Sequence, residues 1–211
     1  MAEPTDNEIH RIEAILDFWF GQIEGVDDTD SSKMQLWWKG HPDDDAEIRR
    51  QFTGDVQAAL DGELDHWAGA ARGTLALVLL LDQFTRVLGR GTPQAFAGDG
   101  AAQRHCLAAL DAGADASLRF CERSFLYMPL MHAEDKELAR RSLAVFEGLE
   151  ADRAEHRGTP PEASSHAQQH AEIVLRFGRY PHRNAIVGRE STPEEEAFLA
   201  SGGPSFGQKK K

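Results

Sequence analysis

Residues 176–189 are the part of the sequence whose side chains are best suited to hold an anion. The stretch RFGRYPHRNAIVGR contains four Arg, one His and no acidic residue, in a chain whose formal net charge is −12. Two Gly and one Pro within it predict a shaped turn rather than a run of helix. Planar guanidinium groups on a rigid turn can bind a carboxylate or phosphate through paired hydrogen bonds. The alternative is that these Arg pair with acids of the same chain and fix its C-terminal part to the rest of the molecule.

A second group of titratable residues follows the apolar segment 120–130. His132, Glu134 and Asp135 lie close together there, and such side chains can act as general acid and base or as metal ligands. They can equally cap a helix or form ion pairs. The possible distant partners are His170, His182, Arg179 and Arg183. The sequence does not bring these segments together, so both interpretations stay open.

A third polar group ends the most hydrophobic segment of the chain, residues 73–88. Asp82 and Arg86 stand four residues apart, with the acid first, which places them on one face of a helix in the favourable order. An exposed pair of this kind contributes only about 0.3–0.5 kcal/mol. On a buried helix, Asp82, Gln83 and Arg86 instead predict a partly buried polar network, which is costly unless every member is satisfied.

Motifs for common catalytic chemistry are missing from the sequence. His166 and His170 have the spacing of two zinc ligands on one helix, but the metalloprotease pattern needs Glu directly after the first His, and Ala167 stands there. Ser124 lacks a G-x-S-x-G setting, and no P-loop or GxGxxG stretch occurs. The sequence therefore argues against nucleotide hydrolysis and dinucleotide-dependent redox chemistry, and we predict no metal and no cofactor.

The elements that position these residues are predicted to be helices. Apolar residues recur at helical intervals over residues 6–20, where Thr5 and Glu8 have the spacing of a capping box. Residues 75–81 are apolar on every side, which indicates a buried central helix. Pro129 is expected to interrupt the apolar segment 120–130. Other helices are predicted to contain Trp37 and Trp38, to begin at Pro42, to span 101–110, to contain Leu138 and Leu149, and to begin at Thr159-Pro160-Glu162 and at Thr192-Pro193-Glu195. No alternation of period two is visible, so the fold class is all-α.

Length and composition limit the class of protein further. We expect residues 1–211 to form a single domain, with flexible ends at 1–5 and 208–211 and a loop at 24–30. An excess of 35 acidic over 23 basic residues argues against binding nucleic acid. The apolar run 75–81 is far shorter than the roughly 20 residues of a membrane span. An acidic N-terminus and two Cys outside any CxxC pair predict a cytoplasmic protein.

Several stretches, read together, resemble a bacterial family of uncharacterised proteins, domain-of-unknown-function family 924. They are ILDFWFG at 15–21, the segment 75–91 with its LDQF, AFAGD at 95–99, and the segments 125–135, 176–189 and 191–195. The resemblance implies a compact array of antiparallel helix pairs, similar to tetratricopeptide-repeat proteins. It implies no particular reaction. No period of about 34 residues is readable in the chain, so the likeness to repeat proteins rests on the resemblance alone.

Three hypotheses about function follow from these patterns. The first is a pocket that binds a small anionic molecule or an acidic peptide end; the second is a hydrolase-type enzyme with His/Glu or metal chemistry; the third is a purely structural polar network. The candidate ligand-binding residues are Asp82, Gln83, Arg86, His132, Glu134, Asp135, His170, Arg176, Arg179, His182, Arg183 and Asn184. The state of oligomerisation does not follow from the sequence.

Overall fold

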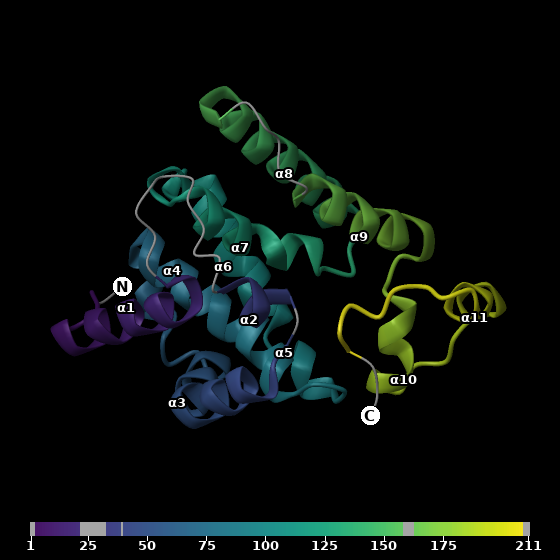
Figure 1. Ribbon diagram of the computed structural model, residues 1–211, viewed down its shortest axis with the longest axis horizontal. Helices are drawn as coiled ribbons and strands as arrows, with labels where there is room; N and C mark the ends of the chain where they lie inside the picture. The colour runs from purple at the N-terminus through teal and green to yellow at the C-terminus, as the bar shows by residue number, and fades with distance from the viewer. Residues whose placement is uncertain (1–2, 22–32, 39, 158–162, 209–211) are drawn as a thin grey trace.

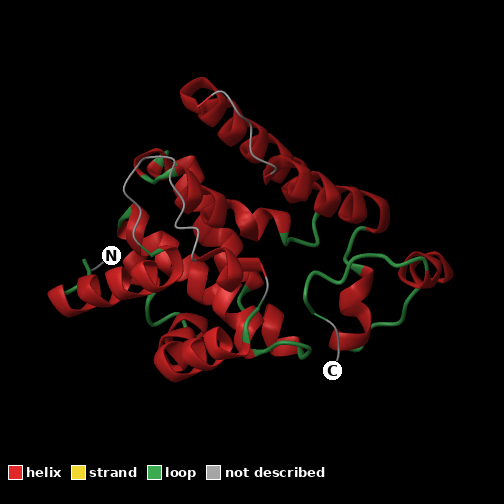
Figure 2. Cartoon of the chain, in the orientation of Figure 1, coloured by secondary structure: helices red, strands yellow, loops and turns green. Residues whose placement is uncertain are grey.

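The computed structural model describes residues 3–21, 33–38, 40–157 and 163–208. Within these ranges the chain forms helices and connecting turns and no strand (Figure 2), which confirms the all-α prediction. None of the helices in these ranges is both long and apolar enough to cross a membrane. The predicted loop at 24–30 and the predicted helix start at Thr159-Pro160-Glu162 lie outside the described residues.

The described residues contain eleven α-helices, labelled α1 to α11 in chain order. Figure 1 shows their arrangement. Their bounds are α1 Asp6–Phe20, α2 Met34–Trp38, α3 Pro42–Leu60, α4 Ala71–Val78, α5 Thr85–Leu88, α6 Asp99–Asp111, α7 Phe120–Met131, α8 Lys136–Arg157, α9 Ala163–Phe177, α10 Asn184–Val187 and α11 Pro193–Ala200. A π-helical turn, Leu79–Phe84, joins α4 to α5, and short 3₁₀ turns are Asp65–Gly69, Pro93–Phe96, Ala114–Ser117 and Pro181–Arg183.

The first and last helices begin with the side-chain caps that the sequence predicts. Thr5 accepts a hydrogen bond from the Glu8 backbone N–H, and the Glu8 carboxylate accepts one from the Thr5 backbone N–H at 2.8 Å. Thr192 and Glu195 repeat this capping box at the start of α11. Each box satisfies backbone donors that a helix start leaves open, and such a cap contributes about 1 kcal/mol.

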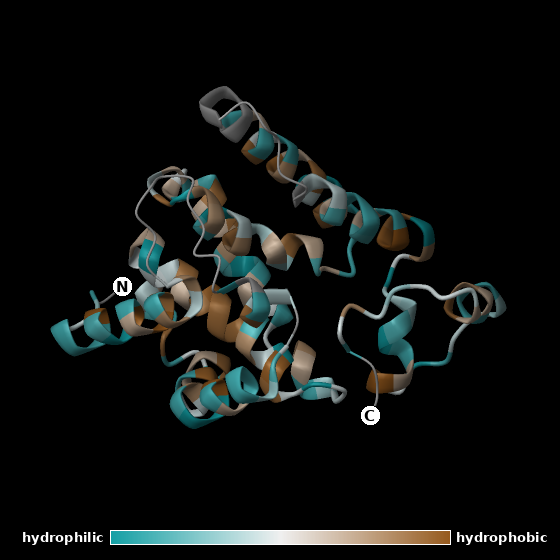
Figure 3. Ribbon diagram, in the orientation of Figure 1, coloured by the Kyte–Doolittle hydropathy of each residue, from teal (hydrophilic) through white to brown (hydrophobic). Residues whose placement is uncertain are grey.

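The apolar segment around α4 forms the centre of the main core, as predicted. Every side chain from Leu75 to Leu81 is fully buried, and α4 packs against α1, α6 and α7. Figure 3 shows the hydrophobic residues concentrated along this helix, whereas α1 and α3 turn hydrophilic residues outward. Burial of each such Leu contributes about 1.5–3 kcal/mol, so this segment fixes where its polar end, Asp82 to Arg86, must lie.

The π-helical turn distinguishes the structure from the single regular helix predicted for residues 73–88. The Thr85 N–H bonds to the Leu80 carbonyl five residues earlier. Side chains donate hydrogen bonds to the neighbouring carbonyls. The Thr85 hydroxyl donates to Leu81 O at 2.7 Å, and Arg86 Nη1 donates to Asp82 O at 2.6 Å. The wider turn changes the direction of the side chains that follow it, and such turns are frequent at functional sites.

Two sequence predictions about helix ends are wrong. Pro129 does not interrupt α7, which continues to Met131; the missing N–H costs one hydrogen bond close to the helix end, and two more residues still continue the helix. Residues 176–189 are also more helical than the predicted turn. Arg176 and Phe177 end α9, and the short helices at Pro181–Arg183 and Asn184–Val187 leave only the residues around Gly178 and after Gly188 non-helical.

The C-terminal part packs against α8 and α9. In Figure 1, α8 and α9 run side by side in opposite directions, and α10 and α11 follow at the C-terminal end. A second, smaller apolar cluster joins them, formed by Ala139 of α8, Ala171 and Val174 of α9, and Tyr180. Phe177 and Phe198 pack against this cluster with ring centres 5.1 Å apart.

Gly98, the residue before α6, makes the closest backbone approach to the π-helical turn. A Cβ atom at this position would lie 2.2 Å from the Leu81 carbonyl oxygen. The absence of a side chain therefore lets α6 start directly against the turn that carries Asp82, and Asp99 follows immediately.

We expect Gly98→Ala to lower the free energy of unfolding by about 1–3 kcal/mol, because the added methyl group must push two backbones apart. The matched control is Gly148→Ala in α8, where a Cβ meets no atom within 4 Å; it should raise stability by about 0.5–1 kcal/mol. Urea unfolding followed by far-UV circular dichroism measures both. Equal stability of the two variants would contradict the close approach.

Candidate functional site

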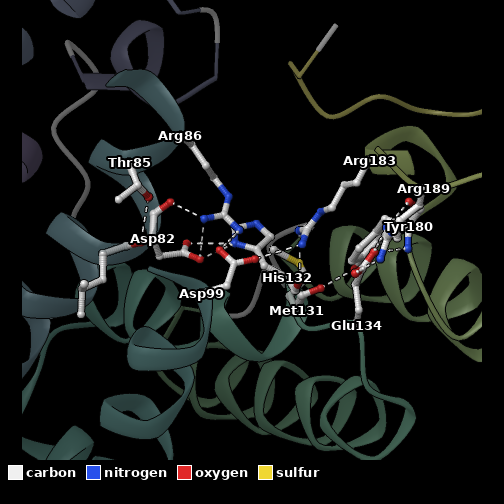
Figure 4. A network of polar contacts seen from close by, with 11 residues as sticks. Asp82, Thr85, Arg86, Asp99, Met131, His132, Glu134, Tyr180, Arg183 and Arg189 are labelled. Carbon is white, nitrogen blue, oxygen red and sulfur yellow. Dashed lines mark hydrogen bonds and ion pairs between the residues drawn. The ribbon is translucent and has the colours of Figure 1, made fainter. Parts of the chain in front are cut away.

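The Asp82 carboxylate is the centre of a polar site at the end of the buried segment (Figure 4). It is fully buried. Both of its oxygens lie 2.9 Å from Nδ1 of His132, and it pairs with Arg86 Nη1 at 3.0 Å and with Gln83 Nε2 at 2.6 Å. Burial raises the pKa of Asp82, but the Arg86 guanidinium and the hydrogen bonds outweigh burial and hold that pKa below its usual range. Asp82 is therefore an ionised carboxylate inside the protein.

Alternating acids and arginines extend from Asp82 to the C-terminal part. Arg86 Nη2 lies 2.9 Å from Asp99 Oδ1, and Arg183 Nη1 lies 3.0 Å from Asp99 Oδ2. Arg183 Nη2 also donates to the His132 carbonyl at 3.0 Å, as Figure 4 shows. We call Asp82, Arg86, Asp99 and Arg183 the charge network. Two carboxylates and two guanidinium groups give it no net charge.

A second ion pair secures the turn after α9. The Arg189 guanidinium bonds Glu134 through two nitrogens, at 2.6 and 2.7 Å, and the Tyr180 N–H donates to Glu134 at 2.8 Å. Burial raises the pKa of Glu134, but the bonds from Arg189 and Tyr180 lower it overall. Glu134 therefore joins the end of α7 to residues 180–189.

Four of the predicted site residues lie outside this centre. Arg179 bonds Glu195 at 2.7 Å, and Asn184 donates to the same carboxylate at 3.2 Å. Arg176 pairs with Glu194 at the surface, and Asp135 accepts the Glu137 and Leu138 N–H groups at the start of α8. The structure thus brings Asp82, Gln83, Arg86, His132, His170 and Arg183 close to one another, whereas Asp135, Arg176, Arg179 and Asn184 serve helix ends and ion pairs elsewhere.

A cavity of about 640 Å³, which we call the main cavity, opens beside the polar site. Its polar end is formed by Gln83, Arg86, His132, His170 and Gln208. Its aromatic walls are Trp19, Trp37, Trp38, Phe120, Phe125 and Phe146. Trp38 is more than half exposed and stacks on His166 with ring centres 5.8 Å apart, so these two rings form part of the rim.

A small cavity of about 50 Å³ adjoins the same polar residues and also contacts His182, Arg183 and Tyr180. The candidate site residues named from the sequence do not include Asp99, Arg189, Gln208 or the aromatic walls. Arg189 lies inside the Arg-rich stretch, and the adjacent Trp37 and Trp38 are also a visible signal in the sequence. The others become neighbours through contacts between distant segments.

Two histidines present hydrogen-bond acceptors to the cavities. A carboxylate and a carbonyl can only accept, so Nδ1 of His132 donates to Asp82, and Nδ1 of His170 donates to the His166 carbonyl at 2.8 Å. Burial lowers the pKa of His132, and burial with the neighbouring His132 lowers that of His170 to about 3. Both rings are therefore neutral at pH 7 and carry a lone pair on Nε2. Their centres are 5.9 Å apart. Each Nε2 atom can accept a hydrogen bond from a ligand. When a carboxylate supports the ring, as in the Asp82–His132 pair, Nε2 can also accept a proton.

Metal binding at this site has less support. Within the described residues, no three His, Cys, Asp or Glu side chains are grouped so that they could hold a metal ion. Cys106 and Cys121 are buried, and burial raises the pKa of Cys121 to about 12, so this thiol stays protonated.

We expect Arg183→Ala to lower the free energy of unfolding by about 3–5 kcal/mol, because it removes one partner from a buried ion-pair chain and leaves Asp99 undercompensated. The control is Arg176→Ala in the same Arg-rich stretch. Its ion pair is exposed, so the change should cost less than about 1 kcal/mol. Urea unfolding at pH 7 measures both. A similar small effect of the two changes would show that the charge network does not hold the C-terminal part in place.

The lowered pKa of His170 makes stability depend on pH. Its folded pKa of about 3 lies below the ordinary value of 6.5, so between these values the unfolded chain binds more protons and stability falls as the pH drops below about 6.5. Between pH 7 and pH 5, His170 accounts for a loss on the order of 2 kcal/mol.

We therefore expect His170→Gln to lose less stability than the wild type between these two pH values. The control, His10→Gln, changes an exposed histidine of α1 and shows the effect of removing an imidazole outside the site. Chemical denaturation at both pH values supplies the comparison. Identical slopes for His170→Gln and the wild type would show that His170 is not held neutral.

Comparison with known proteins places the whole arrangement in one family. Residues 15–203 match the family described as "Bacterial protein of unknown function (DUF924)". The solved structure of a protein of unknown function, ATU0120 from Agrobacterium tumefaciens, is similar, with 33% sequence identity and a TM-score of 0.78 over 92% of this chain and 98% of that chain. No curated protein matches. The chain belongs to the DUF924 family of bacterial proteins of unknown function.

Proposed function

We propose that the chain binds a small organic molecule in the main cavity, with an aromatic or apolar body between the aromatic walls and a polar head at His132 and His170. The observation that carries this proposal is the combination of a cavity of about 640 Å³ with one polar end. Cavities of this size, mostly apolar and with a few convergent polar groups, are typical of small-molecule sites.

The aromatic walls support a flat or apolar ligand body. Trp37 and Phe125 meet edge to face at 4.9 Å, and Trp38 lies over Phe125 at 6.4 Å. These rings already contact one another, so little ordering is needed when a ligand enters. Trp38 is exposed at the rim, and indole rings are enriched at binding surfaces.

The charges at the polar end favour a head group that donates hydrogen bonds. Arg86 is compensated by Asp82 and Asp99, and Arg90, also on the cavity wall, is paired with Asp45 at 3.0 Å. The Arg-rich stretch suggested an anionic ligand. Such a ligand has weaker support, because the guanidinium groups of Arg86 and Arg90 on the cavity wall are already paired with acids. The Nε2 lone pairs of His132 and His170 favour hydroxyl, amine or amide groups instead.

The experiment is a binding screen with pairs of aromatic compounds that share a ring system and differ in the head group, such as indole-3-carboxamide and indole-3-carboxylate. We expect the uncharged member to bind and to quench tryptophan fluorescence. Trp38→Ala should weaken its binding about tenfold through the lost aromatic contact. The control is Ile9→Ala, which truncates an exposed apolar side chain of α1 and should leave binding unchanged.

Three results would count against the proposal. If no compound binds, the cavity is not a small-molecule site. If Trp38→Ala and Ile9→Ala bind equally well, the ligand lies elsewhere. A consistent preference for the carboxylates would restore the anionic ligand predicted from the sequence.

A further inference from the structure

Residues 205–208 cross the polar end of the main cavity. In Figure 1 the yellow end of the chain runs back from α11 towards α10 and α5. The Phe206 ring stacks on the His170 ring, with centres 3.9 Å apart and planes 28° apart, and meets His182 edge to face at 5.3 Å. The Phe206 side chain therefore covers the His170 imidazole, which the head group of a ligand would otherwise contact.

The Gln208 carboxamide forms the second contact of this segment. Its Oε1 accepts a hydrogen bond from the Gly91 N–H at 3.2 Å, and its Nε2 donates to the Arg86 carbonyl at 3.3 Å. Both backbone groups lie at or just beyond the end of α5, where helical hydrogen bonding stops. A backbone donor and a backbone acceptor thus form a two-point receptor for an amide.

Phe206 and Gln208 line both cavities. The residues that contact both cavities are Arg86, His132, His170, Phe206 and Gln208. The first three belong to the body of the protein, and the last two belong to residues 205–208. Withdrawal of these two side chains would join the cavities and bring His182 and Arg183 to the same wall as His132.

The segment is held less firmly than the helices around it. Phe206 has φ 46°, the left-handed conformation, and no other non-glycine residue in the described ranges has a positive φ. For a residue with a bulky side chain this backbone is strained. Both Gln208 hydrogen bonds are longer than the usual 2.9–3.0 Å. The contacts that oppose the strain are the ring stack on His170, edge-to-face contacts of Phe206 with Tyr180 and His182, and the two long hydrogen bonds of Gln208.

We propose that residues 205–208 are a built-in occupant of the polar end, and that the ligand of the main cavity displaces them. This ligand carries an aromatic ring that takes the place of Phe206 on His170. It also carries a primary carboxamide, joined by a short flexible linker, that takes the place of Gln208 between Arg86 O and Gly91 N. The inference rests on the proposed function: the ligand body stays between the aromatic walls, and the head at the polar end is specified as an aromatic amide.

A tethered occupant competes with free ligand at an effective concentration of the order of millimolar. The apparent dissociation constant rises by the inverse of the fraction of molecules whose site is open. Removal of the occupant should therefore tighten the binding of any ligand that uses the same place. A ligand confined to the aromatic walls should show no such gain.

The test compares the full-length wild type with the double variant Phe206→Ala/Gln208→Ala, using the N-acetylated tripeptide amide of sequence Phe-Gly-Gln as probe. Isothermal titration calorimetry should give at least about tenfold tighter binding to the double variant. A second peptide, with glutamate in place of glutamine, should lose most of this gain, because its carboxylate cannot donate to the Arg86 carbonyl. Ser201→Ala, in the exposed turn after α11, is the control and should bind like the wild type.

The single variant Gln208→Glu keeps the Phe206 ring and covers the case in which the double variant does not fold. Its carboxylate faces the Arg86 carbonyl, so the segment should be released, and the Phe-Gly-Gln probe should again bind more tightly than to the wild type. Equal affinity of the probe for the wild type and for both variants would contradict the proposal that residues 205–208 occupy the ligand's place. This holds even if the aromatic compounds of the screen bind. Failure of the probe and of all those compounds together would instead overturn the proposed function.

Discussion

A fully buried carboxylate on the most apolar helix is the constraint on which the rest of the arrangement depends. Asp82 has no exposed surface, and an ion taken out of water is stable only when opposite charge and hydrogen bonds replace its hydration. Arg86 supplies that charge through its Nη1 atom. Its other terminal nitrogen, Nη2, pairs with Asp99, and Asp99 in turn pairs with Arg183. Arg86 lies four residues from Asp82, whereas Asp99 and Arg183 come from other parts of the chain. The requirement of one carboxylate therefore joins the segment after α4 to α6 and to the C-terminal part.

The pairing of charges in the charge network also limits which ligands the cavity can recognise. Every guanidinium group near its polar end is paired with an acid, and His132 and His170 are neutral. The polar end therefore has dipoles and lone pairs rather than free charge, although the whole protein carries −12. An Arg-rich sequence motif does not by itself make an anion site. What matters is whether the folded chain leaves the guanidinium groups unpaired.

Local chemistry explains how much of this the sequence could predict. The capping residues Thr5 and Thr192 and the apolar run 75–81 act over one or two helical turns, and the structure confirms them. The π-helical turn was not predicted because the apolar run 75–81 that leads into it contains no periodicity that could mark a wider turn. The pairing of Asp82 with Arg86 could be read from their spacing of four. The contacts of Asp82 with His132 and of Arg183 with Asp99 span 50 and 84 residues, and no pattern in one sequence encodes them. For the same reason the sequence could not distinguish buried Arg183 from exposed Arg176.

The C-terminal part combines two strengths of attachment. Arg183 and Arg189 hold it through buried or partly buried ion pairs to Asp99 and Glu134, and removal of a partner from such pairs is costly. Residues 205–208, in contrast, are attached through uncharged contacts: the packing of the Phe206 ring against His170, Tyr180 and His182, and two long hydrogen bonds of Gln208. Regions with few buried contacts open at lower free energy than the core that supports them. In the arrangement that we propose, the firm pairs keep the helices in place while the weaker contacts break, so that residues 205–208 leave the polar end without unfolding the protein. Admission of a ligand beside a permanently buried charge would require this separation, because exposure of the charge network itself would cost much of the stability that positions the ligand.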